Sequence, residues 1–202
     1  MKRQLLARFA AVFVVPLLSA LPALPGFAAL QAGAAAPDFK AQASLAGKAF
    51  EYSLADALKT GPVVVYFYPS AFTGGCNLEA HTFSVHRGDF DAAGATIIGV
   101  SLDSIARLNA FSADPKYCAG KIAVASDADG RIAKSYQLKV EGSAEPVKDS
   151  RGVVIDHDFT ERTTFIVTPD HRIHATIGGL DPADNVAAAL KAVRALAQGK
   201  TK

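Results

Sequence analysis

An unbroken apolar run, Val63-Val64-Val65-Tyr66-Phe67-Tyr68, is the feature that most constrains the fold of this chain. A strand with one exposed face alternates apolar and polar residues. A continuous β-branched and aromatic run is instead typical of a strand buried on both faces of a parallel sheet. A second run of this kind follows at Ala95–Ser101. Because parallel strands need crossover connections that place helices against the sheet, the two runs predict an α/β protein.

Helical patterns and further strands alternate along the rest of the chain. The last helix has the clearest start, with Asp181 as N-cap and Pro182 at the first helical position. Residues 139–161 are polar and fit no regular element, so they are expected to form a loop or a loose hairpin. The order β-α-β-α-β-α-β-β-α predicts a mixed central sheet with helices on both faces. The expected strands are 48–52, 63–68, 95–101, 122–125, 162–168 and 171–177, and the expected helices are 53–60, 76–93, 104–113, 130–137 and one that follows Asp181.

Residues 1–28 have the pattern of an export signal. Basic residues near the start precede a short apolar run, Phe9–Leu18, and the small residues of Gly26-Phe27-Ala28 offer a cleavage site. The run is short and is followed by prolines, which disfavours a membrane span, although a retained anchor stays an alternative. We therefore expect a signal peptide at 1–28 and a single domain at 29–202. The protein would be periplasmic or secreted, with no membrane contact once the leader is removed.

Charge and motif content argue against several kinds of partner. The chain has 21 Lys and Arg against 19 Asp and Glu, and without the three leader cations the balance is 18 − 19 = −1. This balance gives no reason to expect nucleic acid binding. No dinucleotide, phosphate-loop or haem-attachment pattern is present, and His81 and His86 are spaced too far apart to share a helix face as metal ligands. We expect neither a bound cofactor nor a metal.

Cys76 is the strongest candidate for chemistry. It lies where the loop after the first apolar run turns into a helix. Free backbone N–H groups and the helix dipole at such a position favour thiolate over thiol. Two other interpretations remain open: a buried structural cysteine and, outside the cytosol, a structural disulfide between Cys76 and Cys118.

Three short motifs mark the ends of the expected strands. Pro69-x-x-x-Thr73-x-x-Cys76 follows one buried strand, Val100-Ser101-x-Asp103 follows the next, and Arg162-Thr163-Thr164-Phe165 opens a later one. Together they resemble the peroxiredoxins, and most closely the bacterioferritin-comigratory (Q) type. The resemblance extends from about Gly33 to the last helix. It implies a thioredoxin-like fold and a thiol-dependent peroxidase that reduces hydrogen peroxide or organic hydroperoxides.

The resemblance also implies a role for each motif residue. Cys76 would attack the hydroperoxide as a thiolate and become a sulfenic acid. Thr73 would hydrogen-bond the thiolate or the peroxide, and Pro69 would shield the pocket from water. A free cysteine with a pKa of about 8.5 is only about 3% ionised at pH 7, and a helix terminus contributes only about 0.3–1 kcal/mol. A second positive group is needed, and Arg162 is the natural candidate because its guanidinium keeps its charge.

Cys118 is the expected resolving cysteine, which would form a disulfide with Cys76 after the Cys76 helix unwinds. In Q-type relatives the second cysteine lies five residues after the first or in the helix after the second strand. His81 occupies the first of these places, and Cys118 falls at or beyond the end of the later helix, in a polar stretch that predicts a surface position. Resolution by an external thiol remains the alternative. Glu79 is left out of the site because an acid is favourable in any first helical turn.

Two other functions remain open. A thioredoxin-like thiol–disulfide oxidoreductase would carry a second cysteine three residues after the first, where this chain has Glu79. An exported peroxide sensor or redox partner would share the first chemical step and would differ in passing its disulfide to another protein. The expected partners are a hydroperoxide and a thiol reductant, thioredoxin-like or other. The resemblance implies a monomer or a dimer.

Overall fold

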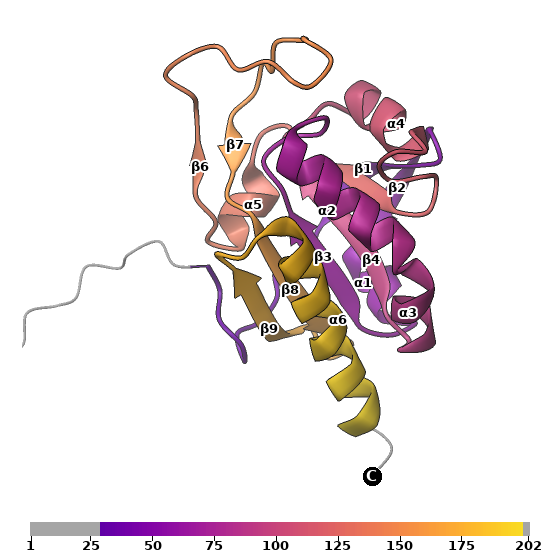
Figure 1. The fold of residues 1–202 in the computed structure, drawn as a ribbon. Coiled ribbons are helices and arrows are strands. Elements are labelled where there is room, and N and C mark those ends of the chain that lie inside the picture. Colours follow the sequence, from indigo (N-terminus) through magenta and orange to yellow (C-terminus); the bar gives the residue numbers. More distant parts are fainter. Residues whose placement is uncertain (1–28, 200–202) are drawn as a thin grey trace, which may run out of the picture.

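The computed structural model describes residues 29–199 as a mixed seven-stranded sheet with helices on both faces (Figure 1). The strand order is β2-β1-β5-β4-β3-β8-β9; β3, β4 and β5 are parallel and the other pairs are antiparallel. The expected α/β class is confirmed. The export signal expected at 1–28 lies outside the described residues. The elements are β1 (Lys40–Leu45), β2 (Lys48–Ser53), α1 (Leu54–Leu58), β3 (Val63–Phe67), α2 (Gly74–Val85), α3 (Arg87–Ala92), β4 (Thr96–Ser101), α4 (Ile105–Ala113), β5 (Ala123–Ser126), α5 (Arg131–Ser135), β6 (Val140–Glu141), β7 (Phe159–Thr160), β8 (Thr163–Thr168), β9 (Arg172–Gly178) and α6 (Pro182–Gly199).

The apolar run forms β3, and every residue of this strand is buried. Val65 and Phe67 face the core that lies against α1 and α5. Val64 and Tyr66 face the opposite core, which includes side chains of α2, α3, α4 and α6. One strand therefore contributes to both hydrophobic cores, and this explains why its sequence does not alternate.

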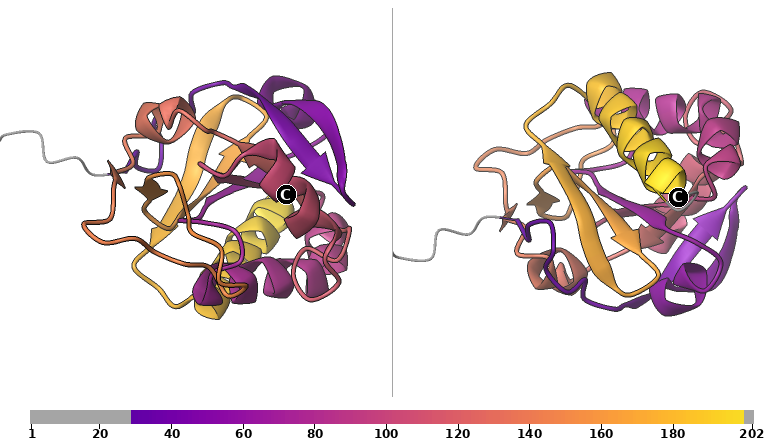
Figure 2. Two further views of the ribbon diagram at one scale, coloured as in Figure 1. Left: turned by 90° about the horizontal axis from the view of Figure 1, so that it is seen from above. Right: turned by 90° about the horizontal axis from the view of Figure 1, so that it is seen from below.

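Tyr66 sets the spacing between β3, β4 and α2. Its ring stacks on Phe83 of α2 with the ring centroids 4.5 Å apart. On the neighbouring strand a Cβ at position 99 would lie 2.5 Å from the Tyr66 ring, so Gly99 leaves the space that the ring occupies. Helix α2 consequently packs closely over β3 and beside α6 (Figure 2).

The helix expected at 76–93 is wrong as a single element, because α2 and α3 are separated at His86. The backbone of His86 leaves helical geometry at φ −89° and ψ 9°. Its ring lies 2.9 Å from the Asp89 carboxylate, and its carbonyl accepts a hydrogen bond from the Asp89 N–H at 2.9 Å. His86 thus ends one helix and begins the next, so the axis changes direction there.

Strand β1 and the segment 139–161 differ in how well the sequence predicted them. Strand β1 was not predicted, although it pairs with both β2 and β5. Residues 139–161 do form a loose hairpin, because β6 and β7 pair over two residues each and a long connection joins them. Within residues 29–199 no helix is both long enough and apolar enough to cross a membrane.

Candidate active site

Cys76 lies in the first turn of α2, directly after the loop that leaves β3. Thr73 is the N-cap, with extended backbone at φ −105° and ψ 151°, and its carbonyl accepts the first helical hydrogen bond from Asn77 at 2.8 Å. Cys76 is only 2% exposed. The thiol is therefore held at the positive end of a helix and away from bulk water, where both the dipole and the free N–H groups favour a negative sulfur.

Strand pairing brings Arg162 to Cys76. The end of β3 lies opposite the start of β8, with Phe67 paired to Thr163, so the residue before β8 lies beside the loop that follows β3. Arg162 Nη2 lies 3.4 Å from Cys76 Sγ. A Cβ at position 75 would lie 3.1 Å from the same Nη2 atom, so Gly75 lets the guanidinium approach the helix. The predicted pairing of a cationic fork with the thiol is present in this geometry.

Glu79 is part of the same site, which the sequence reasoning missed. Its side chain is fully buried, and its Oε2 accepts a hydrogen bond from Arg162 Nη1. Burial raises the pKa of Glu79 to about 7, against the opposing attraction and hydrogen bond of Arg162. The available signal was the spacing: residues three apart on a helix share a face, so an acid at 79 must point the same way as Cys76.

Glu79 makes the stability of the fold depend on pH. A carboxyl whose pKa is raised by folding contributes most when it is protonated, below its ordinary pKa near 4.5, and this contribution is lost as the pH rises through about 7. Between pH 4.5 and 8 the unfolding free energy of the reduced wild type should fall by about 3 kcal/mol relative to Glu79→Gln. Urea denaturation at both pH values measures this difference. Glu141→Gln, which alters an exposed carboxylate on β6, should keep the wild-type pH dependence; the same dependence in Glu79→Gln would contradict the linkage.

Pro69 and Thr73 lie in the loop between β3 and α2. Pro69 is half-buried and follows Tyr68 at the end of the strand. The Thr73 hydroxyl donates to the Ser70 carbonyl at 2.8 Å, which fixes the turn that leads into α2. Their contacts with a thiolate or a peroxide stay predictions.

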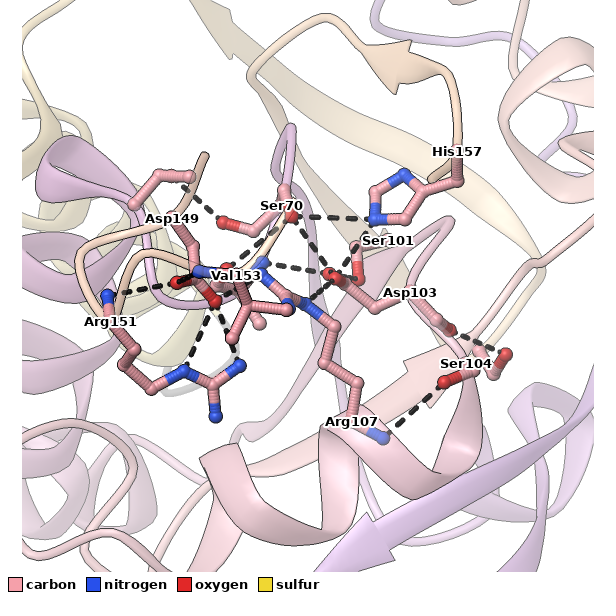
Figure 3. A network of polar contacts seen from close by, with 12 residues as sticks. Ser70, Ser101, Asp103, Ser104, Arg107, Asp149, Arg151, Val153 and His157 are labelled. Atoms are coloured by element: carbon pink, nitrogen blue, oxygen red, sulfur yellow. Dashed lines mark hydrogen bonds and ion pairs between the residues drawn. The ribbon is translucent and has the colours of Figure 1, made fainter. Parts of the chain in front are cut away.

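Asp103 anchors this loop from the end of the neighbouring strand β4 (Figure 3). Its carboxylate accepts hydrogen bonds from the Ala71 N–H at 2.7 Å and from the Ser70 hydroxyl at 3.0 Å. Burial opposes its ionisation, but the hydrogen bonds from His157 and the loop outweigh this and lower the pKa of Asp103. The motif Val100-Ser101-x-Asp103 therefore fixes the loop that leads into α2, the helix that carries the thiol.

Cys118 does not lie on the surface, so the predicted exposed position is wrong. It is 0% exposed and lies in a turn after α4 rather than at a helix end. Ala119 and Gly120 adopt left-handed backbone at φ 53° and 66°, and the Ala119 N–H donates to Asp114 at 2.9 Å, which folds the turn back over the core. Burial raises the pKa of Cys118 well above its ordinary value. Both cysteines are free thiols in this structure, and Cys118 is not activated as a nucleophile here.

The histidines of the described chain show no arrangement for metal. His81 is exposed on α2, and His86 engages Asp89. No group of three or more His, Cys, Asp or Glu side chains within residues 29–199 is placed to hold a metal ion. The polar groups in contact at the site are those of Cys76, Arg162 and Glu79.

Comparison with known proteins gives a consistent set of relatives. Residues 32–176 match the AhpC/TSA family. The peroxiredoxin Bcp of Xanthomonas campestris is 32% identical over 135 residues, which are 64% of this chain and 76% of that protein. The solved structure of peroxidoxin BcpB from Mycobacterium tuberculosis has a TM-score of 0.68 at 25% identity and covers 82% of this chain and 97% of its own. The X. campestris bacterioferritin comigratory protein gives 0.63 at 26% identity and covers 79% and 92%.

Proposed function

Because the chain belongs to the AhpC/TSA family and is a thiol-dependent peroxidase, we propose that Cys76 is the thiol that attacks the hydroperoxide. One observation carries this assignment: Arg162 Nη2 lies 3.4 Å from Cys76 Sγ at the N-terminus of α2. The helix end and the guanidinium both stabilise the thiolate. Cys118 has neither of these advantages, because it is buried in a turn and its pKa is raised.

The first step of the proposed reaction is a displacement at the O–O bond. The Cys76 thiolate bonds to the nearer peroxide oxygen, the O–O bond breaks, and the leaving oxygen takes a proton and departs as water or an alcohol. Cys76 becomes a sulfenic acid. Charge moves from sulfur to the leaving oxygen, so donors that face both atoms lower the barrier. Arg162 supplies such donors next to the sulfur, and Thr73 and Pro69 are proposed to complete the pocket.

Hydrogen peroxide and organic hydroperoxides are the proposed substrates. The solved X. campestris bacterioferritin comigratory protein was described for its alkyl peroxide reduction activity, and this chain shares its fold at 26% identity. No observation favours a thioredoxin-like thiol–disulfide oxidoreductase. The position that would carry its second cysteine is Glu79, which is bound to Arg162.

We propose that Cys118 resolves the sulfenic acid. The Cys118 thiol would attack the Cys76 sulfur, form the disulfide and release the oxygen as water. Both residues belong to the same hydrophobic core, which also contains Tyr66 and Tyr68. We propose that the first turn of α2 unwinds to bring the two sulfurs into bonding geometry, because a disulfide needs Cα atoms within about 7 Å.

Intact mass after one equivalent of hydrogen peroxide tests both assignments. Reduced wild type should lose two hydrogens, and Cys118→Ser should gain one oxygen at an unchanged initial rate, since Cys118 takes no part in the first step. One added oxygen in both proteins would keep Cys76 as the reactive thiol and assign resolution to an external thiol. No rapid change of mass in either protein would overturn the assignment of Cys76.

The cellular setting is proposed from sequence and family alone. The basic and apolar pattern of residues 1–28 supports export to the periplasm or beyond, with a mature chain from about Ala29. Peroxiredoxins act on peroxide with thiol reductants, and for this chain we propose a thioredoxin-like protein or another thiol available in that compartment. A monomer or a dimer is the proposed solution state.

A further inference from the structure

The long connection between β6 and β7 returns to the body of the protein and lies on the loop that leads into α2, the helix of the active-site thiol (Figure 1). We call residues 147–157 of this connection the strap. At one end the Ser150 N–H donates to the Phe72 carbonyl at 2.9 Å. At the other end His157 Nε2 lies 2.9 Å from Asp103 Oδ1. The strap is therefore attached to the active-site loop and to the residue that anchors that loop.

A chain of buried charges fastens the strap (Figure 3). Arg107 of α4 lies between two carboxylates, with Nε 2.7 Å from Asp103 and Nη2 2.8 Å from Asp149 of the strap. Both carboxylate side chains are 0% exposed. Arg107 also donates to the Ala71 carbonyl at 2.8 Å, so the same guanidinium holds strap and loop. Breaking one contact would leave a buried charge without its partner, which ties the members together as a unit.

The Asp149 carboxylate of this chain stays ionised over the ordinary pH range. Burial opposes ionisation of Asp149, but hydrogen bonds from the Arg151 side chain and backbone outweigh it and lower the Asp149 pKa to about 2. Both ring nitrogens of His157 face acceptors, since Nδ1 lies 2.7 Å from the Asp158 carbonyl and Nε2 faces Asp103. An imidazolium supplies a donor to each. The strap is thus fastened by the ionised Asp149 near one end and by the contact between His157 and Asp103 at the other.

Phe72 is the point where the strap meets the active-site loop. It has left-handed backbone at φ 63°, an uncommon conformation for a bulky residue that persists only where the surroundings enforce it. The Arg151 guanidinium lies 3.3 Å from the centroid of its ring. The ring also packs edge-on against Phe111 and Tyr117, at centroid distances of 5.1 and 5.6 Å. One aromatic side chain therefore contacts the strap and the segment that leads into Cys118.

We propose that the strap latches Phe72 and so sets the rate at which the two cysteines can meet. Phe72 directly precedes Thr73, the N-cap of α2, and Tyr117 directly precedes Cys118. Unwinding the first turn of α2 must pull Phe72 away from both Arg151 and Tyr117. Phe72 is accordingly a positioning residue: latched, it keeps Cys76 in the folded site, and released, it opens the core above Cys118. This inference rests on the proposed disulfide between Cys76 and Cys118.

The contacts that hold Phe72 should decide how the sulfenic acid is divided between two reactions. In one, the Cys118 thiol displaces the sulfenic oxygen as water and the disulfide forms. In the other, a second hydroperoxide oxidises the sulfenic acid to a sulfinic acid and leaves as water or an alcohol. Only the first requires α2 to unwind. Strong contacts on Phe72 therefore favour the sulfinic acid at excess peroxide, and weak contacts favour the disulfide.

The test compares Arg151→Gln with Arg131→Gln in the full chain by rapid-quench intact mass after addition of hydrogen peroxide. Arg151 and Arg131 each pair with the aspartate two residues before them, but the Arg131–Asp129 pair is exposed at the start of α5. Arg151→Gln should form the disulfide about two- to thirtyfold faster, the range expected from a lost cation–π contact. The initial oxidation of Cys76 should stay within twofold of wild type, and less sulfinic acid should form. Arg131→Gln should match wild type, and Arg151→Lys should recover part of the slow rate.

Hydrogen exchange supplies a second readout that does not depend on peroxide. The Asn77 amide, which bonds the Thr73 carbonyl at 2.8 Å, should exchange faster in Arg151→Gln than in wild type and Arg131→Gln. Equal or slower disulfide formation in Arg151→Gln would overturn the latch. So would a wild type that oxidises at Cys76 and forms no internal disulfide. A wild type in which Cys76 does not oxidise would instead overturn the proposed function.

Discussion

Replacement of Cys76 by serine is expected to reduce peroxide turnover to background, a loss of about three orders of magnitude or more. A serine hydroxyl stays protonated at pH 7, and an oxygen nucleophile cannot form a sulfenic acid. Cys118 cannot substitute for Cys76, because it is 0% exposed and burial raises its pKa, so it presents almost no thiolate. The loss should therefore be nearly complete although a second thiol remains in the chain.

Peroxide consumption at pH 7 with excess dithiothreitol measures this loss without a protein reductant. Cys118→Ser is the matched control, since it removes the other thiol by the same change of atom and should retain the first oxidation step. A Cys76→Ser protein that keeps more than about a tenth of the wild-type rate would contradict the assigned role. Retained activity lost only in the double variant would assign the chemistry to Cys118.

The central strands could be predicted because their burial on both faces produces a recognisable apolar pattern in their own sequence. Strand β3 is buried on both faces and therefore reads as an unbroken apolar run. Strand β1 could not be found in this way, because its sequence Lys-Ala-Gln-Ala-Ser-Leu buries only Ala43 and Ser44. Its place is decided by pairing with β2 and β5, and β5 lies about 80 residues further along the chain. Short, weakly apolar strands depend on tertiary partners that no local pattern displays.

The site residues that belong to a recognisable sequence motif could be predicted. Those whose position depends on a partner far away in the sequence could not. Cys76 and Arg162 were found from a strand-to-helix turn and from the start of a later strand. Glu79 was dismissed on its local position, yet it is buried against Arg162, 83 residues away. Cys118 was placed on the surface because its neighbours in sequence are polar. Two left-handed residues after it reverse the chain and turn the thiol inward, and their backbone angles cannot be read from residue types.

In the polar stretch 139–161, too, a partner on another element decides which side chains are buried. Its charges read as a solvated loop, but Asp149 is fully buried because Arg107, on another element, neutralises it. Without that partner a carboxylate would remain in water. Polar composition therefore predicted the irregular backbone of this segment correctly and gave no sign that it is attached to the active-site loop.

Replacement of Arg162 by glutamine should lower the rate constant for Cys76 oxidation by about two to four orders of magnitude. A hydrogen bond to a charged group contributes about 1.5–3 kcal/mol, which is roughly ten- to a hundredfold. Arg162 is placed to make two of them in the transition state, one to the sulfur, which lies 3.4 Å away in the reduced protein, and one to a peroxide oxygen. The change is best made in a Glu79→Gln background, so that no buried carboxylate loses its cation. Arg194→Gln, which removes an exposed guanidinium on α6, should leave the rate unchanged.

Two reactions separate the two roles of Arg162. Alkylation by iodoacetamide needs only the thiolate, so the Arg162→Gln, Glu79→Gln protein should lose less in this reaction than in peroxide oxidation when both are measured at one pH. Oxidation by hydrogen peroxide also needs a donor for the leaving oxygen, so its deficit should be the larger of the two. A peroxide deficit no larger than the alkylation deficit would limit Arg162 to stabilising the thiolate. A loss below tenfold in both reactions would reduce it to a structural partner of Glu79.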